Sequence, residues 1–208
     1  MAEALTNRLH AALSCVARDL TRHGRRFALV GGLAVSIRAE PRLTRDLDLA
    51  VVAADDADAE GLVRALTADG YRAAAVVEHE ERKRLATVRL VTPGGNEAGI
   101  VLDVLFASSG IESEVVTDAE LLEVLPGTTL PVARVGHLVA LKLLARDDRR
   151  RPQDADDLAA LRRAASDDDV ECARGAVALI QRRGFARGRD LQASLVAWLA
   201  DASLGSGR

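Results

Sequence analysis

Residues 31–51 read GGLAVSIRAEPRLTRDLDLAV, and this stretch decides the fold. A double glycine stops the apolar run FALV and leads into a helix-like segment, which an arginine-rich turn follows. Asp46 and Asp48 then stand inside an apolar run. Because alternate residues of a strand project from the same face, the two carboxylates lie together while Leu47 and Leu49 face the core. Such a pair of like charges needs a cation between the acids or access to water.

A pair of aspartates in this setting suits Mg²⁺, which binds through one or two carboxylates together with the phosphates of a substrate. The spacing alone carries little weight, because D-x-D also occurs at 56–58, 154–156 and 167–169. Only the triplet at 46–48 follows a strand, a Gly-Gly pair and a helix, and continues into an apolar strand. For the other three triplets, which lie in polar segments, solvated acids are a sufficient explanation.

Asp103 is the third acidic candidate. It interrupts the apolar segment IVLDVLF, where a carboxylate is costly unless it is hydrogen-bonded, paired or bound to a metal. If this strand neighbours the strand of Asp46, three carboxylates meet at one site. That arrangement suits two-metal phosphoryl transfer, in which the ions lie about 3.5–4 Å apart. The alternative is an acid at a strand edge that pairs with an arginine.

The glycines supply a complementary feature. A strand that ends at Gly31 and Gly32 before a helix allows backbone N–H groups to approach a phosphate at the helix N-terminus. A tight turn between strand and helix is the alternative, and a Gly-Gly pair alone favours it. The nearby aspartates favour the phosphate-binding interpretation.

A second group of charged residues lies in the C-terminal half. Lys142 stands in the apolar helix VALKLLA, where it either extends to water or reaches a triphosphate as a point charge. Asp154 and Asp157 share one face at the start of the next predicted helix. They complement the helix dipole there, and they also lie where they can hold the arginines at 149–151.

The chain is predicted to be α/β (α+β), with a mixed sheet flanked by helices over residues 1–133 and a helical bundle over 134–208 packed on it. Apolar periodicity predicts helices at 3–22, 33–39 and 57–69, strands at 27–30, 47–52, 85–92 and 100–107, and four helices at 134–146, 152–165, 169–183 and 189–201. A turn is expected at 93–96 between the last two strands. We expect a cleft between the two halves, where ligand sites tend to lie.

Composition limits the classes of function. The chain has 208 residues and a net charge of −3, which gives no global attraction to nucleic acid or membrane. Aromatic residues make up 2%, which argues against a base-stacking surface. No apolar run approaches the ~18–20 residues that span a bilayer, and no signal peptide is seen, so the cytoplasm is expected. Cys15 and Cys172 are expected to be buried free thiols.

The motifs GG-x₁₃-DLDL, VLDVL, K-LLAR and RPQDADDL resemble those of the DNA-polymerase-β-like nucleotidyltransferase superfamily. Within it, the chain is most similar to the AbiEii-type abortive-infection toxins and their MenT-like relatives, over roughly residues 27–161. The resemblance implies a mixed sheet with flanking helices and a helical C-terminal region.

The implied activity is the transfer of a nucleoside monophosphate from an NTP to tRNA or a protein. Two Mg²⁺ ions, which Mn²⁺ can replace, would assist it, and a cognate antitoxin would be a partner. Transfer to a small molecule such as an antibiotic is an alternative. A nucleotide-binding relative without catalysis is another, although the three acids argue against it. No membrane partner is implied.

The resemblance also implies roles for individual residues. Asp46 and Asp48 match the metal-binding pair, Asp103 the third acid, Gly31 and Gly32 the phosphate-binding turn, Lys142 a catalytic lysine at the nucleotide, and Asp154 or Asp157 the acid of the last motif. Arg45 is placed to neutralise phosphate charge or to pair with Asp103. Two departures stand out, because Gly32 replaces a common serine and Gln153 a common basic residue.

Overall fold

The computed structural model describes residues 2–42, 44, 46–79, 84–94, 99–146 and 153–201, with side chains from residue 7 onward. In these ranges the strands are β1 (Phe27–Val30), β2 (Asp46–Val51), β3 (Arg72–His79), β4 (Arg84–Val91), β5 (Val101–Leu105), β6 (Glu120–Leu125) and β7 (Thr128–Val132). The helices are α1 (Ala2–Arg22), α2 (Gly31–Arg38), α3 (Asp56–Ala68), α4 (Glu112–Thr117), α5 (Val135–Ala145), α6 (Gln153–Ala164), α7 (Asp167–Arg182) and α8 (Leu191–Ala200).

The strands form one mixed sheet in the order β3-β4-β5-β2-β1-β7-β6. The two strands that carry the predicted acids, β2 and β5, are parallel neighbours at its centre. Strand β1 lies on the other side of β2 and runs antiparallel to it. The acids of β2 therefore lie between the end of β1, where the glycine pair begins, and the strand of Asp103.

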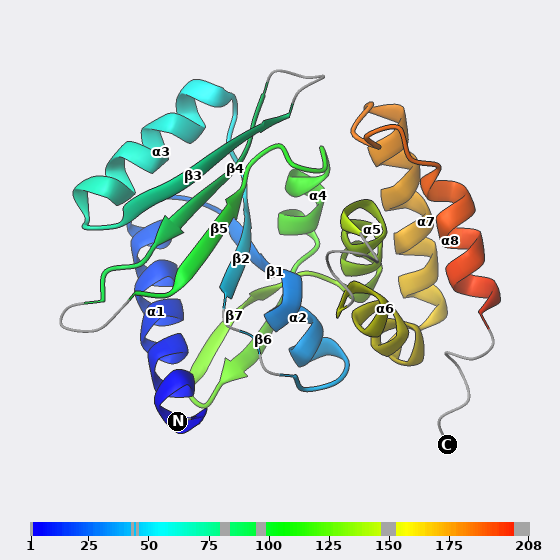
Figure 1. The fold of residues 1–208 in the computed structure, drawn as a ribbon, viewed down its shortest axis with the longest axis horizontal. Helices are drawn as coiled ribbons and strands as arrows, with labels where there is room; N and C mark the ends of the chain where they lie inside the picture. The colour runs from blue at the N-terminus through cyan, green and yellow to red at the C-terminus, as the bar shows by residue number, and fades with distance from the viewer. Residues whose placement is uncertain are drawn as a thin grey trace.

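Helices cover both faces of the sheet (Figure 1). Helices α1 and α3 lie on one side, while α2 and α4 lie on the other, between the sheet and the group α5–α8. Leucine, valine and isoleucine with alanine fill the core, as the low aromatic content requires. Helix α2 contacts β1 and β2 on one side and α5 and α6 on the other, so it joins the two halves of the molecule.

The predicted fold class is confirmed, and each predicted helix and strand is present with ends shifted by a few residues. Helix α2 starts earlier than expected, because Gly31 and Gly32 form its first turn. The proposed boundary at 133 stays a prediction, although the described strands end at Val132 and the described helices from α5 onward follow it. The predicted turn at 93–96 lies partly outside the described residues.

Three strands and one helix were missing from the prediction. Strand β3 has seven consecutive exposed residues and no apolar alternation, so periodicity gave no signal for it. Strands β6 and β7 form a hairpin around Pro126 and Gly127, and Gly127 has a φ of +74°. Helix α4 is only six residues long.

Cys15 and Cys172 are free thiols, as predicted, but they are half-buried rather than buried. Among the described residues, no helix combines the length and the apolar character that crossing a bilayer requires.

Candidate active site

The glycine turn and the β2 acids are fitted closely to one another. Gly31 has a φ of +66°, a backbone conformation that residues with a Cβ rarely adopt. A Cβ built at Gly31 would collide with the carboxylate of Asp48. In the β1–β2 pair Asp48 stands opposite Val30, the residue that precedes the turn. Glycine is therefore required at position 31, both by the backbone and by the acid beside it.

Asp48 also stands opposite Asp103 in the parallel pair of β2 and β5. The sequence left the pairing of these two strands open, and the observed register places the two acids side by side on one face of the sheet. Asp46 lies one pleat further along the same face of β2. The three predicted carboxylates thus converge at one end of the central strands.

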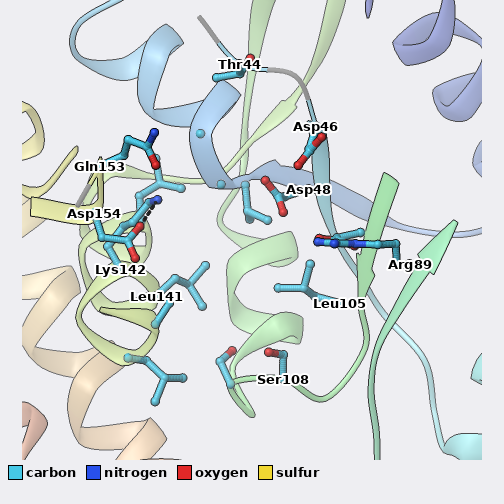
Figure 2. Close-up of a pocket in the computed structure, with 18 of the residues that line it drawn as sticks. Thr44, Asp46, Asp48, Arg89, Leu105, Ser108, Leu141, Lys142, Gln153 and Asp154 are labelled. Atoms are coloured by element: carbon cyan, nitrogen blue, oxygen red, sulfur yellow. Dashed lines mark hydrogen bonds and ion pairs between the residues drawn. The ribbon is translucent and has the colours of Figure 1, made fainter. Parts of the chain in front are cut away.

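The acids line a cavity of about 660 Å³ between the sheet and the C-terminal helices. Figure 2 shows Asp46, Asp48 and Arg89 on one side of this cavity and Lys142 with Asp154 across from them. Gly31, Gly32, Arg42, Thr44, Asp103, Ser108, Ser109, Gln153 and Arg187 complete its polar lining. We call this space the first cavity. The predicted cleft between the two halves therefore exists.

Arg89 of β4 holds the third acid. Its Nε and Nη2 atoms donate hydrogen bonds to Oδ1 and Oδ2 of Asp103, at 2.8 and 2.7 Å. The two residues are also direct partners in the β4–β5 pair. These bonds, followed by the charges of Asp103, Asp46 and Asp48, raise the pKa of Arg89 despite its partial desolvation. The ion pair with an arginine, one part of the alternative stated for Asp103, is present with Arg89, but Asp103 lies in the middle of an inner strand and not at an edge.

A buried network forms the opposite wall. Lys142 Nζ lies 2.8 Å from Asp154 Oδ1 and 2.6 Å from Asp157 Oδ2. Asp157 also accepts two hydrogen bonds from Arg42, at 2.6 and 2.9 Å, so it connects α6 to the loop that precedes β2. Asp154 and Asp157 are only 3% and 1% exposed. Lys142 is therefore fixed by two acids, and it neither extends freely to water nor stands alone.

Most predicted site residues line the first cavity, and two require comment. Asp157 does not line it, since it lies behind Lys142 and Arg42 and holds both. Arg45 lies outside the described residues, so its predicted role stays a prediction. The arginines at 149–151, expected as partners of Asp154 and Asp157, are also outside that part of the chain. The described partners of these acids are Lys142 and Arg42 instead.

Of the three predicted metal-binding acids, Asp46 and Asp48 are better placed than Asp103 to bind a divalent cation. Among the described residues of this wall, three carboxylates face the guanidinium of Arg89, which gives these four side chains a formal charge of −2. Two carboxylates are the usual protein contribution to Mg²⁺ when phosphates supply further ligands. Within the described residues, no three acidic, histidine or cysteine side chains are grouped closely enough to hold a metal alone. Asp103 would join only if Arg89 released one of its oxygens.

The family model described as "Nucleotidyl transferase AbiEii toxin, Type IV TA system" matches residues 15–205. The chain belongs to the AbiEii family. This match confirms the resemblance that the motifs indicated. It also extends the resemblance beyond residues 27–161 to nearly the whole chain. No curated protein matches the chain.

Solved structures resemble this AbiEii chain in fold. An antigenic nucleotidyltransferase-like protein from Paracoccidioides brasiliensis is 20% identical, with a TM-score of 0.51, and the match covers 92% of this chain and 93% of that protein. MenT4, a nucleotidyltransferase toxin from Mycobacterium tuberculosis H37Rv, is 18% identical with a TM-score of 0.40, over 96% and 93% of the two chains. The first of these likenesses supports the nucleotidyltransferase-like fold.

In this AbiEii chain, the loop after β5 forms the floor of the site. Ser109 donates from its backbone N and its Oγ to Oε1 of Glu112, at 2.7 and 2.9 Å. Burial raises the pKa of Glu112, although the bonds from Ser109 oppose that shift. Ser108 accepts hydrogen bonds from Arg187 at its backbone O and its Oγ, at 2.8 and 3.1 Å. The loop is thus held by α4 on one side and by the C-terminal region on the other.

Sequence reasoning missed Arg89, Arg42 and Arg187 as members of the AbiEii site. A signal existed for Arg89, because it interrupts the apolar strand LATVRLVT just as Asp103 interrupts IVLDVLF. Neither Arg42 nor Arg187 carried such a signal, since both stand in polar loops. Only the fold brings them to the cavity.

Proposed function

We propose that this chain transfers a nucleoside monophosphate from an NTP to a hydroxyl group of tRNA or of a protein. Mg²⁺ would be the metal, and the chain would act as the toxin of a toxin–antitoxin pair whose antitoxin is its partner. The observation that carries the proposal is the position of Asp48, in register with Asp103 and packed against the glycine turn. Membership of the AbiEii family supports the class of reaction.

Asp46 and Asp48 would hold the divalent cation. A bound cation neutralises the triphosphate and stabilises the attacking and leaving oxygens of an in-line displacement. The net negative charge at this wall favours cation binding, and it disfavours a bare triphosphate. NTP binding is therefore expected to depend on the metal.

The start of α2 would receive the triphosphate. Its N-cap residue is Val30, which offers no side-chain hydrogen bond, and its first turn contains no acid. The first N–H groups of a helix need partners from outside the helix, and they favour anions. Phosphate oxygens can fill that requirement at Gly31 and Gly32, which have no side chain of their own, and the guanidinium of Arg42 lies against Gly32. This mode of contact needs no hydroxyl at Gly32.

Asp154 would bind a donor group of the nucleotide. Its Oδ1 accepts from Lys142, while its Oδ2 is buried and has no partner among the described residues. A carboxylate repels phosphate, so the complement of Oδ2 is an O–H or N–H donor, such as a ribose hydroxyl or a base amino group. Lys142 fixes this acid through their 2.8 Å ion pair and would contact the nucleotide from the same wall.

Asp103 would receive the acceptor hydroxyl. A carboxylate offers about four lone-pair sites, so Asp103 can accept a hydroxyl hydrogen bond while Arg89 holds it. The acceptor oxygen then attacks the α-phosphorus in line with the departing pyrophosphate. Arg89 holds Asp103 in the orientation for that contact through its two hydrogen bonds.

The deciding experiment is incubation of the purified chain with each α-labelled NTP, Mg²⁺, and either total tRNA or cell protein. We expect label to enter one acceptor pool, and Asp48→Asn to reduce the rate at least about 100-fold, the loss typical when one electrostatic contact to a transition state is removed. Asp168→Asn, which changes an exposed acid at the start of α7, is the matched control and should transfer normally.

Transfer that survives Asp48→Asn would refute the metal-site assignment. Calorimetry that detects no Mg²⁺-dependent NTP binding would favour a non-catalytic relative. Label that enters only an added antibiotic would favour the small-molecule alternative. For the toxin role, expression of the chain should arrest growth, and Asp46→Ala should relieve the arrest.

A further inference from the structure

Strand β3 forms one edge of the sheet and is exposed along almost its whole length (Figure 1). Among the described strands only β4 pairs with it, and its residues 72–78 are all exposed. Val76 and Val77 are 59% and 55% exposed, although both are large apolar residues. The backbone N–H and C=O groups on the outer side of an edge strand have no ladder partner. Such a strand is therefore a template on which another strand can pair.

The opposite edge of the sheet is protected by charge. Strand β6 carries Glu120 and Glu123, and Glu120 is held by Arg38 at 2.6 Å. Charged side chains on an edge strand discourage pairing with another chain. Residues 73–77 of β3 differ, because they read AAAVV and contain no charged residue and no proline. The middle of β3 therefore lacks the side-chain protection that β6 has.

The pairing of β3 with β4 defines a regular segment in the middle of this edge. Register irregularities lie on both sides of residues 75–77, so Ala75, Val76 and Val77 form the regular part. Ala75 stands opposite Arg89, which points toward the site, so Ala75 and Val77 face the site. These two residues line a second cavity that adjoins the first one. Val76 projects from the opposite face of the sheet.

The two ends of β3 carry opposite charges. Arg72 begins the strand and Glu78 lies near its end, and both are exposed. Neither forms an ion pair with another described residue. If β3 pairs with β3 of a second copy in the antiparallel direction, the basic end of each strand lies beside the acidic end of the other. Parallel pairing would instead bring like charges together, which is unfavourable. The strand is thus complementary to itself in one direction.

We propose that two copies of this chain pair through β3, antiparallel and with Val76 at the two-fold axis. Val76 of one copy then lies opposite Val76 of the other, and Ala75 lies opposite Val77. Cross-strand pairs of β-branched residues stabilise a sheet. Main-chain hydrogen bonds along the new ladder supply the affinity, and the charges at the strand ends set the direction. Such an interface is isologous, because the same patch serves both copies. It does not depend on the reaction proposed above.

The pairing would join the two seven-stranded sheets into one. A two-fold axis between antiparallel edge strands is perpendicular to the sheet, so both copies present the same face on the same side. The two active sites would therefore lie on one side of the dimer. The added strand would run beside Ala75 and Val77, at the rim of the second cavity.

The test measures the association of the full chain by analytical ultracentrifugation over a range of concentrations. We expect an equilibrium between monomer and dimer. Val76→Lys places two like charges opposite each other at the axis and should weaken the dimer about tenfold or more. Val76→Ile keeps a β-branched apolar side chain and should dimerise within about twofold of the original chain. Leu121→Lys, at a 73% exposed residue of β6, is the matched control for a lysine on an edge strand and should also dimerise normally.

Charge reversal tests the direction of the pairing. Arg72→Glu and Glu78→Arg should each weaken the dimer about fivefold, because each variant brings like charges together at both ends of the ladder. The double variant has opposite charges at the two ends again, so it should recover most of the lost affinity. A general loss of folding would not produce this recovery, and neither would contact of β3 with a different surface. Urea unfolding checks that every variant is folded.

A chain that stays monomeric up to ~1 mM would overturn the proposal. A dimer that Val76→Lys leaves intact would overturn it too, and dissociation by Leu121→Lys would place the interface at β6 instead. If Val76→Lys folds poorly, the charge-reversal series decides alone. In that series, a double variant that recovers no affinity would refute antiparallel pairing at β3.

Discussion

Arg89 and Asp103 form a two-point ion pair across neighbouring strands, with Arg89 Nε and Nη2 at 2.8 and 2.7 Å from the two carboxylate oxygens. This pair changes the simple picture of three acids gathered around metal ions. The guanidinium of Arg89 is hydrogen-bonded to both carboxylate oxygens of Asp103. Its positive charge is also attracted by Asp46 and Asp48. Arg89 thus acts as a counter-ion that is built into the protein.

Arg89→Met should tighten the binding of Mn²⁺ to the chain without nucleotide. Removal of one positive charge beside the three acids increases their attraction for a cation, by about 1 kcal/mol even at the dielectric of bulk water, which corresponds to about fivefold in affinity. Isothermal titration calorimetry with Mn²⁺ in the absence of nucleotide measures this affinity. Arg64→Met, at a 71% exposed side chain on α3, is the matched control and should bind Mn²⁺ like the original chain. Unchanged or weaker binding in Arg89→Met would contradict the counter-ion role.

Gly31→Ala should reduce both stability and NTP binding. The substitution places a Cβ at a φ of +66° and against the Asp48 carboxylate. Gly24→Ala separates the two effects, because Gly24 has a φ of +67° but no atom within 4 Å of a built Cβ. We expect a loss of about 1–2 kcal/mol in the free energy of unfolding for Gly24→Ala from backbone strain alone. Gly31→Ala should lose more than that.

Urea unfolding and calorimetric NTP titration measure the two effects on the glycine variants. Only Gly31→Ala should weaken NTP binding, since only there must Asp48 move. Equal behaviour of the two variants would show that Gly31 serves the turn and not the acid.

The acids of the site could be predicted from sequence because each breaks an apolar pattern. Asp46, Asp48 and Asp103 stand in strands whose other residues are apolar and mostly buried in the core. Each acid can therefore be recognised from its own sequence context. Their convergence needed one further fact, the parallel pairing of β2 with β5. That pairing connects residues about fifty positions apart, and strand order over such a separation is set by packing, which local patterns do not encode.

The partners of the acids were harder to predict for the same reason. Arg42 reaches Asp157 from 115 positions away, and Arg187 reaches Ser108 across 79. An arginine in a polar loop is ordinary on any surface, so the sequence gives no cue to its partner. His79 stands at the end of the strand that periodicity missed, and its burial comes from the α7–α8 loop. These contacts exist only once both halves of the chain are packed together.

Asp157→Asn should destabilise the fold by about 3–5 kcal/mol in the free energy of unfolding. The change leaves Lys142 and Arg42 without their shared acid inside the protein, and breaking one partner of a buried ionic network has costs of that order. Asp156→Asn is the control, since Asp156 is exposed on the same helix turn and contributes only through the helix dipole, about 0.3–1 kcal/mol. Chemical denaturation compares the two. Similar losses would show that the network around Asp157 contributes little net stability.

The contribution of Glu112 to the free energy of unfolding should decrease as pH rises. Burial raises the pKa of Glu112, so the folded chain binds this proton more tightly than the unfolded chain does. The stabilising contribution is therefore fully present below the ordinary value of 4.5, and it is lost as pH rises through the raised value. Glu112→Gln resembles the protonated form and can still accept from Ser109. Its stability relative to the original chain should therefore increase with pH and then level off.

Glu114→Gln should show the opposite dependence and is the matched control two residues away. Hydrogen bonds from Arg183 lower the pKa of Glu114, so its contribution is present above the ordinary value of 4.5 and is lost as pH falls through the lowered one. Glu114→Gln should thus be less stable than the original chain at neutral pH, with a difference that shrinks in acid. Urea unfolding at a series of pH values measures both curves. A stability difference for Glu112→Gln that does not change with pH would show that the pKa of Glu112 is the same in the folded and the unfolded chain.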